Sequence, residues 1–185
     1  MKIIIITAPS GAGKTTILKQ IMQLYPQLRF SISACTRAPR SGEIDGKDYH
    51  FLSVTDFQNM ISNSEFLEWE MVYQDKYYGT PKSEITRISN DGNIPIVDID
   101  VKGALNIKKM YGDQSLSIFI QPPSIDELRN RLIKRNTETP TSLAERIARA
   151  EFELQYAHQF DVCVVNEVIE DAVNEVSNAI GTYLK

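Results

Sequence analysis

Apolar residues in this chain form short continuous runs that alternate with longer segments of helical periodicity. Residues 2–7 are a run of mostly β-branched side chains, which predicts a strand buried on both faces. Apolar side chains then recur at helical spacing over residues 15–25, until a proline ends the pattern. Further short apolar runs, each followed by a helical pattern, lie at residues 94–99, 116–121 and 162–165. This repetition of strand and helix favours an α/β fold around a central parallel sheet.

Capping residues predict where three of the helices begin. The pairs are Ser124 with Glu127, Ser142 with Glu145, and Thr80 with Pro81. The first two pairs have the spacing of a capping box, in which each side chain binds a free amide of the first helical turn. The third pair has the pattern of an N-cap followed by a first-turn proline, since proline lacks the amide that this position leaves unpaired.

Two segments interrupt the strand–helix pattern. Residues 34–90 are rich in Gly, Pro, aromatic and charged residues with short alternating strands, so we expect an inserted α+β lobe there. Residues 135–142 are polar and contain a proline, which predicts a connection between two helices.

Composition limits the kinds of partner. Among the 185 residues, 24 acidic and 20 basic side chains give a net charge of −4, which argues against a general attraction to nucleic acid or to an anionic membrane. Any anion site must therefore be local. The apolar runs are too short for a signal peptide or a membrane span, and Cys35 and Cys163 lack disulfide or metal-ligand spacing. We expect a cytoplasmic protein in a reducing compartment.

Between the first predicted strand and helix lies a phosphate-loop pattern, Ala8-Pro9-Ser10-Gly11-Ala12-Gly13-Lys14-Thr15. Its glycines let successive backbone amides converge on phosphate oxygens, and the helix N-terminus adds partial positive charge. Lys14 is expected to reach the β and γ phosphates of ATP, and Thr15 to offer its hydroxyl to Mg²⁺. The predicted ATP contacts in this loop are Ser10, Gly11, Ala12, Gly13, Lys14, Thr15 and Thr16. The alternative is a tight turn that binds nothing.

A second ligand for the magnesium ion is expected at the end of a neighbouring strand. Asp98 follows the apolar pair Ile96-Val97 and is our candidate, because carboxylates at strand ends hold Mg²⁺ in phosphate-loop enzymes. The alternative is that Asp98 or Asp100 caps the following helix.

Several spaced motifs then occur in one order along nearly the whole chain. They are the phosphate loop, residues 36–43 (TRAPRSGE), 46–49 (GKDY), 65–68 (EFLE), 77–79 (YYG) and 98–100 (DID). In this order they resemble the guanylate kinase family. The resemblance implies a three-layer phosphate-loop fold and phosphorylation of GMP, and of dGMP, by MgATP. It also implies a core at residues 1–33, 91–124 and 147–185, a GMP-binding lobe at 34–90 and a small helical lid at 125–146.

The resemblance assigns the GMP contacts to the inserted lobe. Arg37 and Arg40 would grip the acceptor phosphate, since a planar guanidinium offers paired donors to phosphate oxygens. Glu68 would accept from the N1–H and N2–H₂ donors of guanine, the alternative being an ordinary strand glutamate that faces solvent. The remaining implied GMP contacts are Ser33, Tyr49, Tyr78, Thr80, Asp98 and Asp100.

The resemblance also supplies cations for the transferred phosphoryl group. Arg131, Arg135 and Arg146 would contact phosphates from the lid and, with Lys14 and Arg37, form the catalytic set. The alternative is that each lid arginine pairs with a nearby carboxylate on a solvated surface. Asn166, after the last apolar strand, would lie near the adenine of ATP. No general base is required, because positioning and electrostatics dominate phosphoryl transfer.

Two other functions stay open from sequence. Guanylate-kinase-like modules that bind phosphopeptides without catalysis share this fold, although they have usually lost the lysine of the phosphate loop. A kinase with a different phosphate acceptor is the second alternative, because fold alone does not fix the substrate. The expected partners are the nucleotides alone, without nucleic acid or membrane, and formation of a homo-oligomer is left open.

Overall fold

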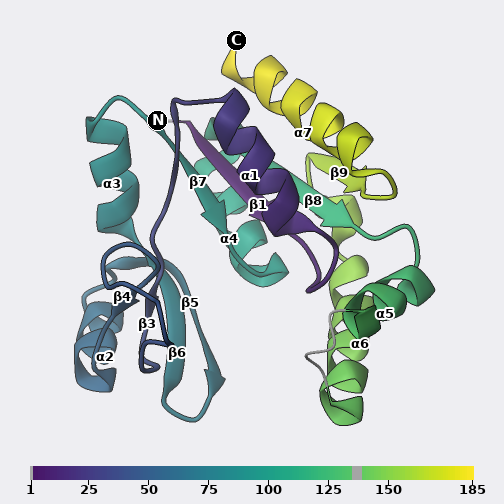
Figure 1. The fold of residues 1–185 in the computed structure, drawn as a ribbon. Helices are drawn as coiled ribbons and strands as arrows, with labels where there is room; N and C mark the ends of the chain where they lie inside the picture. Colours follow the sequence, from purple (N-terminus) through teal and green to yellow (C-terminus); the bar gives the residue numbers. More distant parts are fainter. Residues whose placement is uncertain (1, 135–138) are drawn as a thin grey trace. The chain divides into compact units, whose positions relative to one another are not determined.

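The computed structural model of the protein describes residues 2–134 and 139–185, without the side chain of Tyr73. Its elements form two compact units (Figure 1). Unit 1 comprises Met1–Ile3 and Gln27–Val97, and unit 2 comprises Ile4–Pro26 and Asp98–Lys185.

A five-stranded sheet carries the predicted buried strands. Its strand order is β2 (Leu28–Phe30), β7 (Ile94–Asp98), β1 (Ile3–Thr7), β8 (Ser115–Gln121) and β9 (Val162–Val165). The pairs β2–β7 and β8–β9 are parallel. The side chains of Ile3, Ile4, Ile5 and Ile6 are fully buried, as the run of β-branched residues predicts. The expectation of an α/β fold with a central parallel sheet is confirmed.

Unit 2 has five helices among the residues that the structure describes. They are α1 (Lys14–Leu24), α4 (Val101–Tyr111), α5 (Ile125–Lys134), α6 (Pro140–Leu154) and α7 (Ile169–Leu184). Helices α1 and α7 lie side by side, and α4 packs on β8 (Figure 1). Helix α5 packs on α6 through a small apolar cluster of Leu128, Leu132, Ile147 and Ala150. Short 3₁₀ turns, η1 (Gly112–Gln114) and η2 (Ala157–Gln159), precede β8 and β9.

Unit 1 contains a smaller four-stranded sheet and two helices. The strand order is β4 (His50–Phe51), β3 (Ala34–Cys35), β6 (Lys76–Pro81) and β5 (Phe66–Tyr73). Unit 1 also contains helices α2 (Val54–Ser62) and α3 (Lys82–Asn90), together with β2 and most of β7 from the five-stranded sheet. Phe57 of α2 is fully buried and stacks on Phe66 and Tyr77, with ring centroids 4.3 and 5.3 Å apart. These aromatic contacts anchor α2 to the β5–β6 hairpin and give the unit its own core.

Of the three predicted helix starts, the one at Ser124 is confirmed. The Ser124 hydroxyl accepts from the amide of Glu127 at 3.1 Å, ahead of α5. The start at Ser142 is wrong, because α6 begins at Pro140 with a capping box formed by Thr139 and Ser142. Proline is favoured in the first turn and Thr139 is a good N-cap, so the earlier start prevails. Pro140–Ser142 therefore belong to α6 and not to the expected connection, and residues 135–138 of that connection lie outside the described residues.

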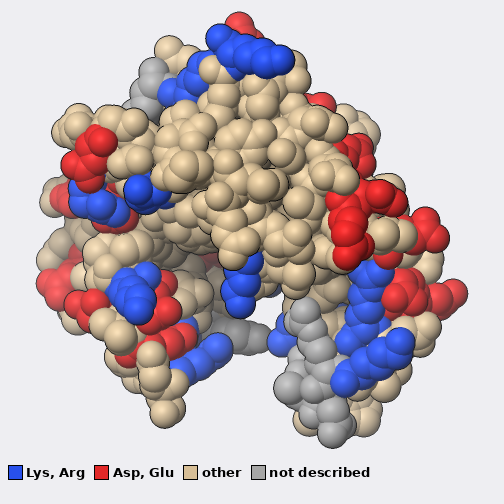
Figure 2. Space-filling view, turned by 45° about the horizontal axis from the view of Figure 1, so that its top comes forward, with Lys and Arg blue, Asp and Glu red and all other residues tan. Residues whose placement is uncertain are grey.

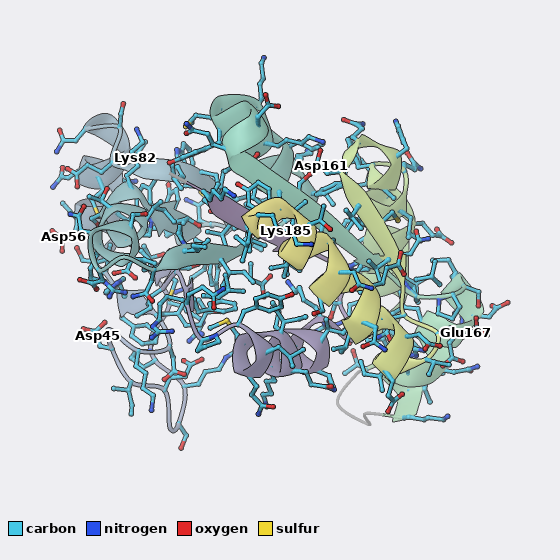
Figure 3. All side chains as sticks on the ribbon, turned by 90° about the horizontal axis from the view of Figure 1, so that it is seen from above. Asp45, Asp56, Lys82, Asp161, Glu167 and Lys185 are labelled. Carbon is cyan, nitrogen blue, oxygen red and sulfur yellow. The ribbon has the colours of Figure 1, made fainter. Side chains whose placement is uncertain are left out.

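The predicted N-cap at Thr80 is also wrong. Helix α3 begins at Lys82 (labelled in Figure 3), and Pro81 is its N-cap residue without a side-chain hydrogen bond. Thr80 instead belongs to β6, where it pairs across the sheet with Glu68. Thr80 is buried, and its strand pairing together with the hydrogen bond from its hydroxyl to Glu68 outweighs the capping preference of threonine.

The surface carries both signs of charge. Figure 2 shows Lys and Arg interspersed with Asp and Glu on the face that it draws. In the part of the chain that the structure describes, no helix is both long and apolar enough to cross a bilayer.

Candidate functional site

The phosphate loop runs from the end of β1 to the start of α1, within unit 2. Gly11 and Gly13 adopt φ values of 96° and 97°, a conformation that L side chains rarely take. A Cβ at Gly13 would lie 2.1 Å from Nδ2 of Asn166, and one at Gly11 would lie 2.9 Å from Cδ1 of Leu128. Both glycines are thus required by backbone conformation and by space, and the loop has the glycine-dependent turn that the sequence predicts.

Lys14 and Asp98, two predicted site residues far apart in the sequence, form an ion pair. The Nζ of Lys14 donates to Oδ1 of Asp98, and their side chains are 22% and 30% exposed. Burial lowers the pKa of Lys14 to about 8, against the opposing charges of Glu153 and Asp100. Lys14, a predicted phosphate ligand, therefore has a carboxylate partner in this structure.

Asp100 performs the capping role that the sequence left open for Asp98 or Asp100. Its Oδ1 accepts from the amides of Lys102 and Gly103 at 2.8 and 3.0 Å, at the start of α4. The cap fixes the turn after β7 and so holds Asp98 at the strand end. Contact of Asp98 and Asp100 with GMP stays a prediction.

The donor atoms near Lys14 suit a magnesium ion. Thr15 is exposed and offers a hydroxyl, and Asp98 offers a carboxylate, both hard oxygen donors. Among the residues that the structure describes, no group of three or more His, Cys, Asp or Glu could hold a metal ion. One hydroxyl and one carboxylate are enough protein ligands for Mg²⁺ at a nucleotide site, where phosphates and water supply the other ligands.

Asn166 braces the phosphate loop from the end of β9. It is 5% exposed, and its Nδ2 donates to the carbonyl of Ala12 at 2.7 Å. Its own backbone carbonyl accepts from Nη2 of Arg131 at 3.0 Å. The sequence predicts an adenine contact for Asn166 but gives no signal of this loop contact, because the two segments are 154 positions apart.

The lid arginines have different surroundings. Arg131 donates through Nε to Glu127 at 2.9 Å, which is the surface ion pair expected as the alternative, while its Nη2 reaches Asn166. Arg146, in the second turn of α6, donates to the hydroxyl of Ser10 in the phosphate loop. The predicted site residue Arg135 lies outside the described residues. Thr16 is exposed on α1, one residue beyond Thr15.

Arg37 is the centre of the predicted acceptor-phosphate site in unit 1. Its Nη1 and Nη2 donate to the two carboxylate oxygens of Glu43, at 2.5 and 2.7 Å. The guanidinium lies 4.8 Å from the ring centroid of Tyr49 and 5.5 Å from that of Phe51. The hydrogen bond with Glu43 raises the pKa of Arg37 and, from the other side, lowers the pKa of Glu43 to about 2.

The other predicted phosphate ligands lie around Arg37. Tyr49 and Tyr78 meet edge to face with ring centroids 6.2 Å apart. Arg40 is exposed, and its amide donates to Glu43 at 2.7 Å. The buried Nε of Arg37 has no hydrogen-bond partner within residues 2–134 and 139–185, so one donor stays available beside these side chains.

The residues predicted to read the base come together in part. The hydroxyl of Thr80 donates to Oε1 of Glu68 at 2.6 Å, and Glu68 is half-buried, so it is not a freely solvated strand residue. Ser33 lies between β2 and β3, where its carbonyl accepts from the amide of His50 at 2.9 Å. Thr80 aligns one oxygen of the carboxylate.

Sequence reasoning missed the role of Glu43. It accepts from both terminal nitrogens of Arg37 and from the amide of Arg40, so it organises the whole arginine loop. The sequence did hold a signal for this role, because Glu43 is three residues after Arg40, the spacing of a β-turn. The turn is closed by a hydrogen bond from the amide of Glu43 to the carbonyl of Arg40.

The fold and this site define a class of protein before any comparison. A parallel sheet, a glycine loop and a lysine at the start of the following helix form a phosphate-loop nucleotide-binding protein. The family model described as guanylate kinase matches residues 1–183. The chain belongs to the guanylate kinase family.

Individual relatives agree over nearly the whole length. The guanylate kinase of Porphyromonas gingivalis is 48% identical over 184 residues, covering 99% of this chain and 98% of that protein. The guanylate kinase of Salinibacter ruber is 47% identical over 182 residues, covering 98% and 96%. The crystal structure of guanylate kinase from Anaplasma phagocytophilum superposes with a TM-score of 0.76 at 30% identity, covering 100% and 87%. A gluconokinase structure from Sinorhizobium meliloti, at 13% identity and a TM-score of 0.50, shares the fold alone.

Proposed function

We propose that this chain transfers the γ-phosphoryl group of ATP to GMP, which yields ADP and GDP. The observation that carries the proposal is an intact phosphate loop, with Lys14 at the start of α1, in a chain that belongs to the guanylate kinase family over residues 1–183. A module that only binds phosphopeptides would have no need of this lysine, so its retention favours catalysis.

Residues of unit 2 bind the donor nucleotide in this proposal. The amides of the phosphate loop and the Nζ of Lys14 hold the phosphates, and Asn166 keeps the loop in its binding conformation through Ala12. Thr15 and Asp98 would hold Mg²⁺. When bound, the ion would neutralise charge on the β and γ phosphates. Lys14 would then leave Asp98 for phosphate oxygens, to which the ammonium is also attracted.

Residues of unit 1 bind the acceptor phosphate. Arg37, Arg40, Tyr49 and Tyr78 supply donors, and the unpartnered Nε of Arg37 supports an anion at this position. Glu43 keeps the guanidinium in a single orientation through two hydrogen bonds. The acceptor therefore meets an ordered cation, which reduces the entropy lost on binding.

Guanine is selected by the carboxylate of Glu68. Thr80 donates to its Oε1 and so restricts the orientation of the carboxylate, whose oxygens would accept from donors such as N1–H and N2–H₂ of guanine. Adenine offers no such pair of donors and would leave the carboxylate desolvated without a partner, which disfavours AMP. Because dGMP carries the same base and phosphate, we propose it as a second acceptor.

The lid arginines neutralise the phosphoryl group during transfer. Arg131 and Arg146 are placed beside the phosphate loop by Asn166 and Ser10, and we keep Arg135 as a third member. We also keep the division into a core, a GMP lobe at 34–90 and a lid at 125–146, with closure over the nucleotides excluding water. Self-association and a cytoplasmic location stay predictions of the sequence alone.

A coupled assay of ADP release with MgATP and each of GMP, AMP, CMP and UMP tests the function. We expect turnover with GMP alone, and equal turnover of another monophosphate would contradict the substrate assignment. Glu68→Gln should raise the KM for GMP roughly tenfold and narrow the preference for GMP over AMP, since it removes one of two acceptor oxygens. Glu65→Gln is the matched control, because Glu65 is an exposed carboxylate just before the same strand. An unchanged base preference in Glu68→Gln would remove Glu68 from this role.

A further inference from the structure

A buried carboxylate in unit 1 has no role in the proposed reaction. Glu84 lies in the first turn of α3, and its side chain is 8% exposed. Carboxylates are rarely buried unless their charge is paired, because removing them from water is costly. The partners of Glu84 therefore indicate what it holds in place.

Two of its partners belong to the segments that carry predicted GMP ligands. The amide of Ile32 donates to Oε2 of Glu84 at 3.2 Å, and Nε2 of His50 lies 3.4 Å from Oε1. Ile32 directly precedes Ser33, and His50 directly follows Tyr49. The carboxylate is thus one residue away from the base-reading segment and one residue away from the phosphate-binding tyrosine.

The segment around Ile32 depends on this contact. Strand β2 ends at Phe30 and β3 begins at Ala34, so the amide of Ile32 falls between two strands and outside their hydrogen-bond ladders. A second bond joins the two segments directly, since the amide of His50 donates to the carbonyl of Ser33 at 2.9 Å. Glu84 and this backbone bond together fix Ser33 and β4 to each other.

Arg87 keeps the carboxylate charged and oriented. Its Nε and Nη2 donate to the two oxygens of Glu84 at 3.0 and 2.9 Å, one helical turn away on α3. Burial opposes the charge, but the hydrogen bonds from Arg87 and the Ile32 amide outweigh it, so the pKa of Glu84 is lowered. Arg87 is itself 52% exposed, so it reaches Glu84 from the solvent side.

We infer that Glu84 is a positioning residue for the acceptor nucleotide, which holds the Ser33 and Tyr49 segments in register for GMP. The inference rests on the proposed function, because it takes Ser33 and Tyr49 as GMP ligands. Glu84 would act through those two segments without touching the nucleotide, and it would have no effect on the donor site.

Glu84→Gln tests this role. An amide has a single oxygen, so glutamine cannot accept on both sides and turns its own N–H donors toward His50 or Ile32. We expect the KM for GMP to rise about tenfold, the effect of losing one charge-assisted hydrogen bond, with the KM for ATP within about twofold of the parent. His50→Leu, which has no donor for Glu84, should raise the KM for GMP by a smaller factor.

Asp161→Asn is the matched control. Asp161 (labelled in Figure 3) is a carboxylate of unit 2 that likewise accepts from a backbone amide, that of Ser117, and pairs with a cation, Lys108. Its loss should lower the unfolding temperature without changing either KM. A purely structural role for Glu84 would do the same, so the KM for GMP separates the two explanations.

The outcomes are distinct. A folded Glu84→Gln enzyme with the parent KM for GMP, or with equal rises for GMP and ATP, would overturn the inference and leave the proposed function intact. Failure of the parent chain to phosphorylate GMP would instead overturn the proposed function. If Glu84→Gln does not fold, His50→Leu decides, and an unchanged KM for GMP in that variant refutes the role.

Discussion

At the scale of single residues, three cations of the candidate site are each paired with a carboxylate. Arg37 forms an ion pair with Glu43, Lys14 with Asp98 and Arg131 with Glu127. Each cation is therefore oriented by a carboxylate. In two of these pairs, Arg37 with Glu43 and Arg131 with Glu127, the partners are close together in the sequence. The third joins two predicted site residues that are 84 positions apart.

The titration of Lys14 gives a prediction at this scale. Its pKa is lowered to about 8, chiefly by burial, so the ammonium loses its proton and its charge as the pH rises through that value. ATP keeps its negative charges in this range, so the attraction falls and kcat/KM for ATP should decline above about pH 8. Lys14→Arg stays charged at these pH values and should lack the decline, whatever its absolute rate. The measurement is kcat/KM for ATP from pH 6 to 10, and parallel profiles for both proteins would contradict the assignment.

At the scale of elements, the phosphate loop depends on an asparagine from a distant strand. Sequence alone predicts the turn, because the glycines, Lys14 and the flanking strand and helix are contiguous. It does not predict the bond from Asn166 to Ala12, since nothing local links the end of β9 to this loop. The helix starts show the same limit. Helix α6 is capped at Thr139, three residues before the predicted start at Ser142. At Thr80, the pairing with β5 outweighs the local preference of threonine for a helix N-cap.

Gly13→Ala tests whether the phosphate loop depends on Asn166. The φ of 97° at Gly13 strains any side chain, and a Cβ would also displace the amide of Asn166, so we expect the KM for ATP to rise at least about tenfold. Gly92→Ala is the control, because Gly92 also has a positive φ, 73°, but would place its Cβ in open space. The control should lose about 1 kcal/mol of unfolding free energy with an unchanged KM for ATP. Urea unfolding compares the stability of the two variants. Equal KM values for ATP in both would show that backbone strain alone, and not the contact with Asn166, affects ATP binding.

At the scale of the molecule, most residues of the candidate site divide between the two compact units, although Asp98 and Asp100 of unit 2 are also predicted to contact GMP. The proposed ATP ligands that the structure describes lie within Ile4–Pro26 and Asp98–Lys185, and the arginines, tyrosines and Glu68 proposed for GMP lie within Gln27–Val97. Sequence predicts an inserted lobe at residues 34–90 from its change in composition, and that division stays a prediction. It does not anticipate the contacts that organise the lobe, such as Glu84 with Ile32, because a buried charge leaves no trace in periodicity.

This division predicts that each nucleotide stabilises the protein through a different set of residues. A ligand at about 100 times its Kd adds roughly 2.7 kcal/mol to the unfolding free energy, which raises the unfolding temperature measurably in a protein of this size. We expect Arg37→Ala to abolish the rise caused by GMP and to keep the rise caused by MgATP, while Lys14→Ala should do the reverse. Removing Arg37 leaves Glu43 exposed to solvent and removing Lys14 leaves Asp98 without its cation, so each variant is compared with its own ligand-free unfolding temperature. If either substitution removed both rises, one set of residues would serve both nucleotides, and the assignment of ATP and GMP to separate parts of the chain would be wrong.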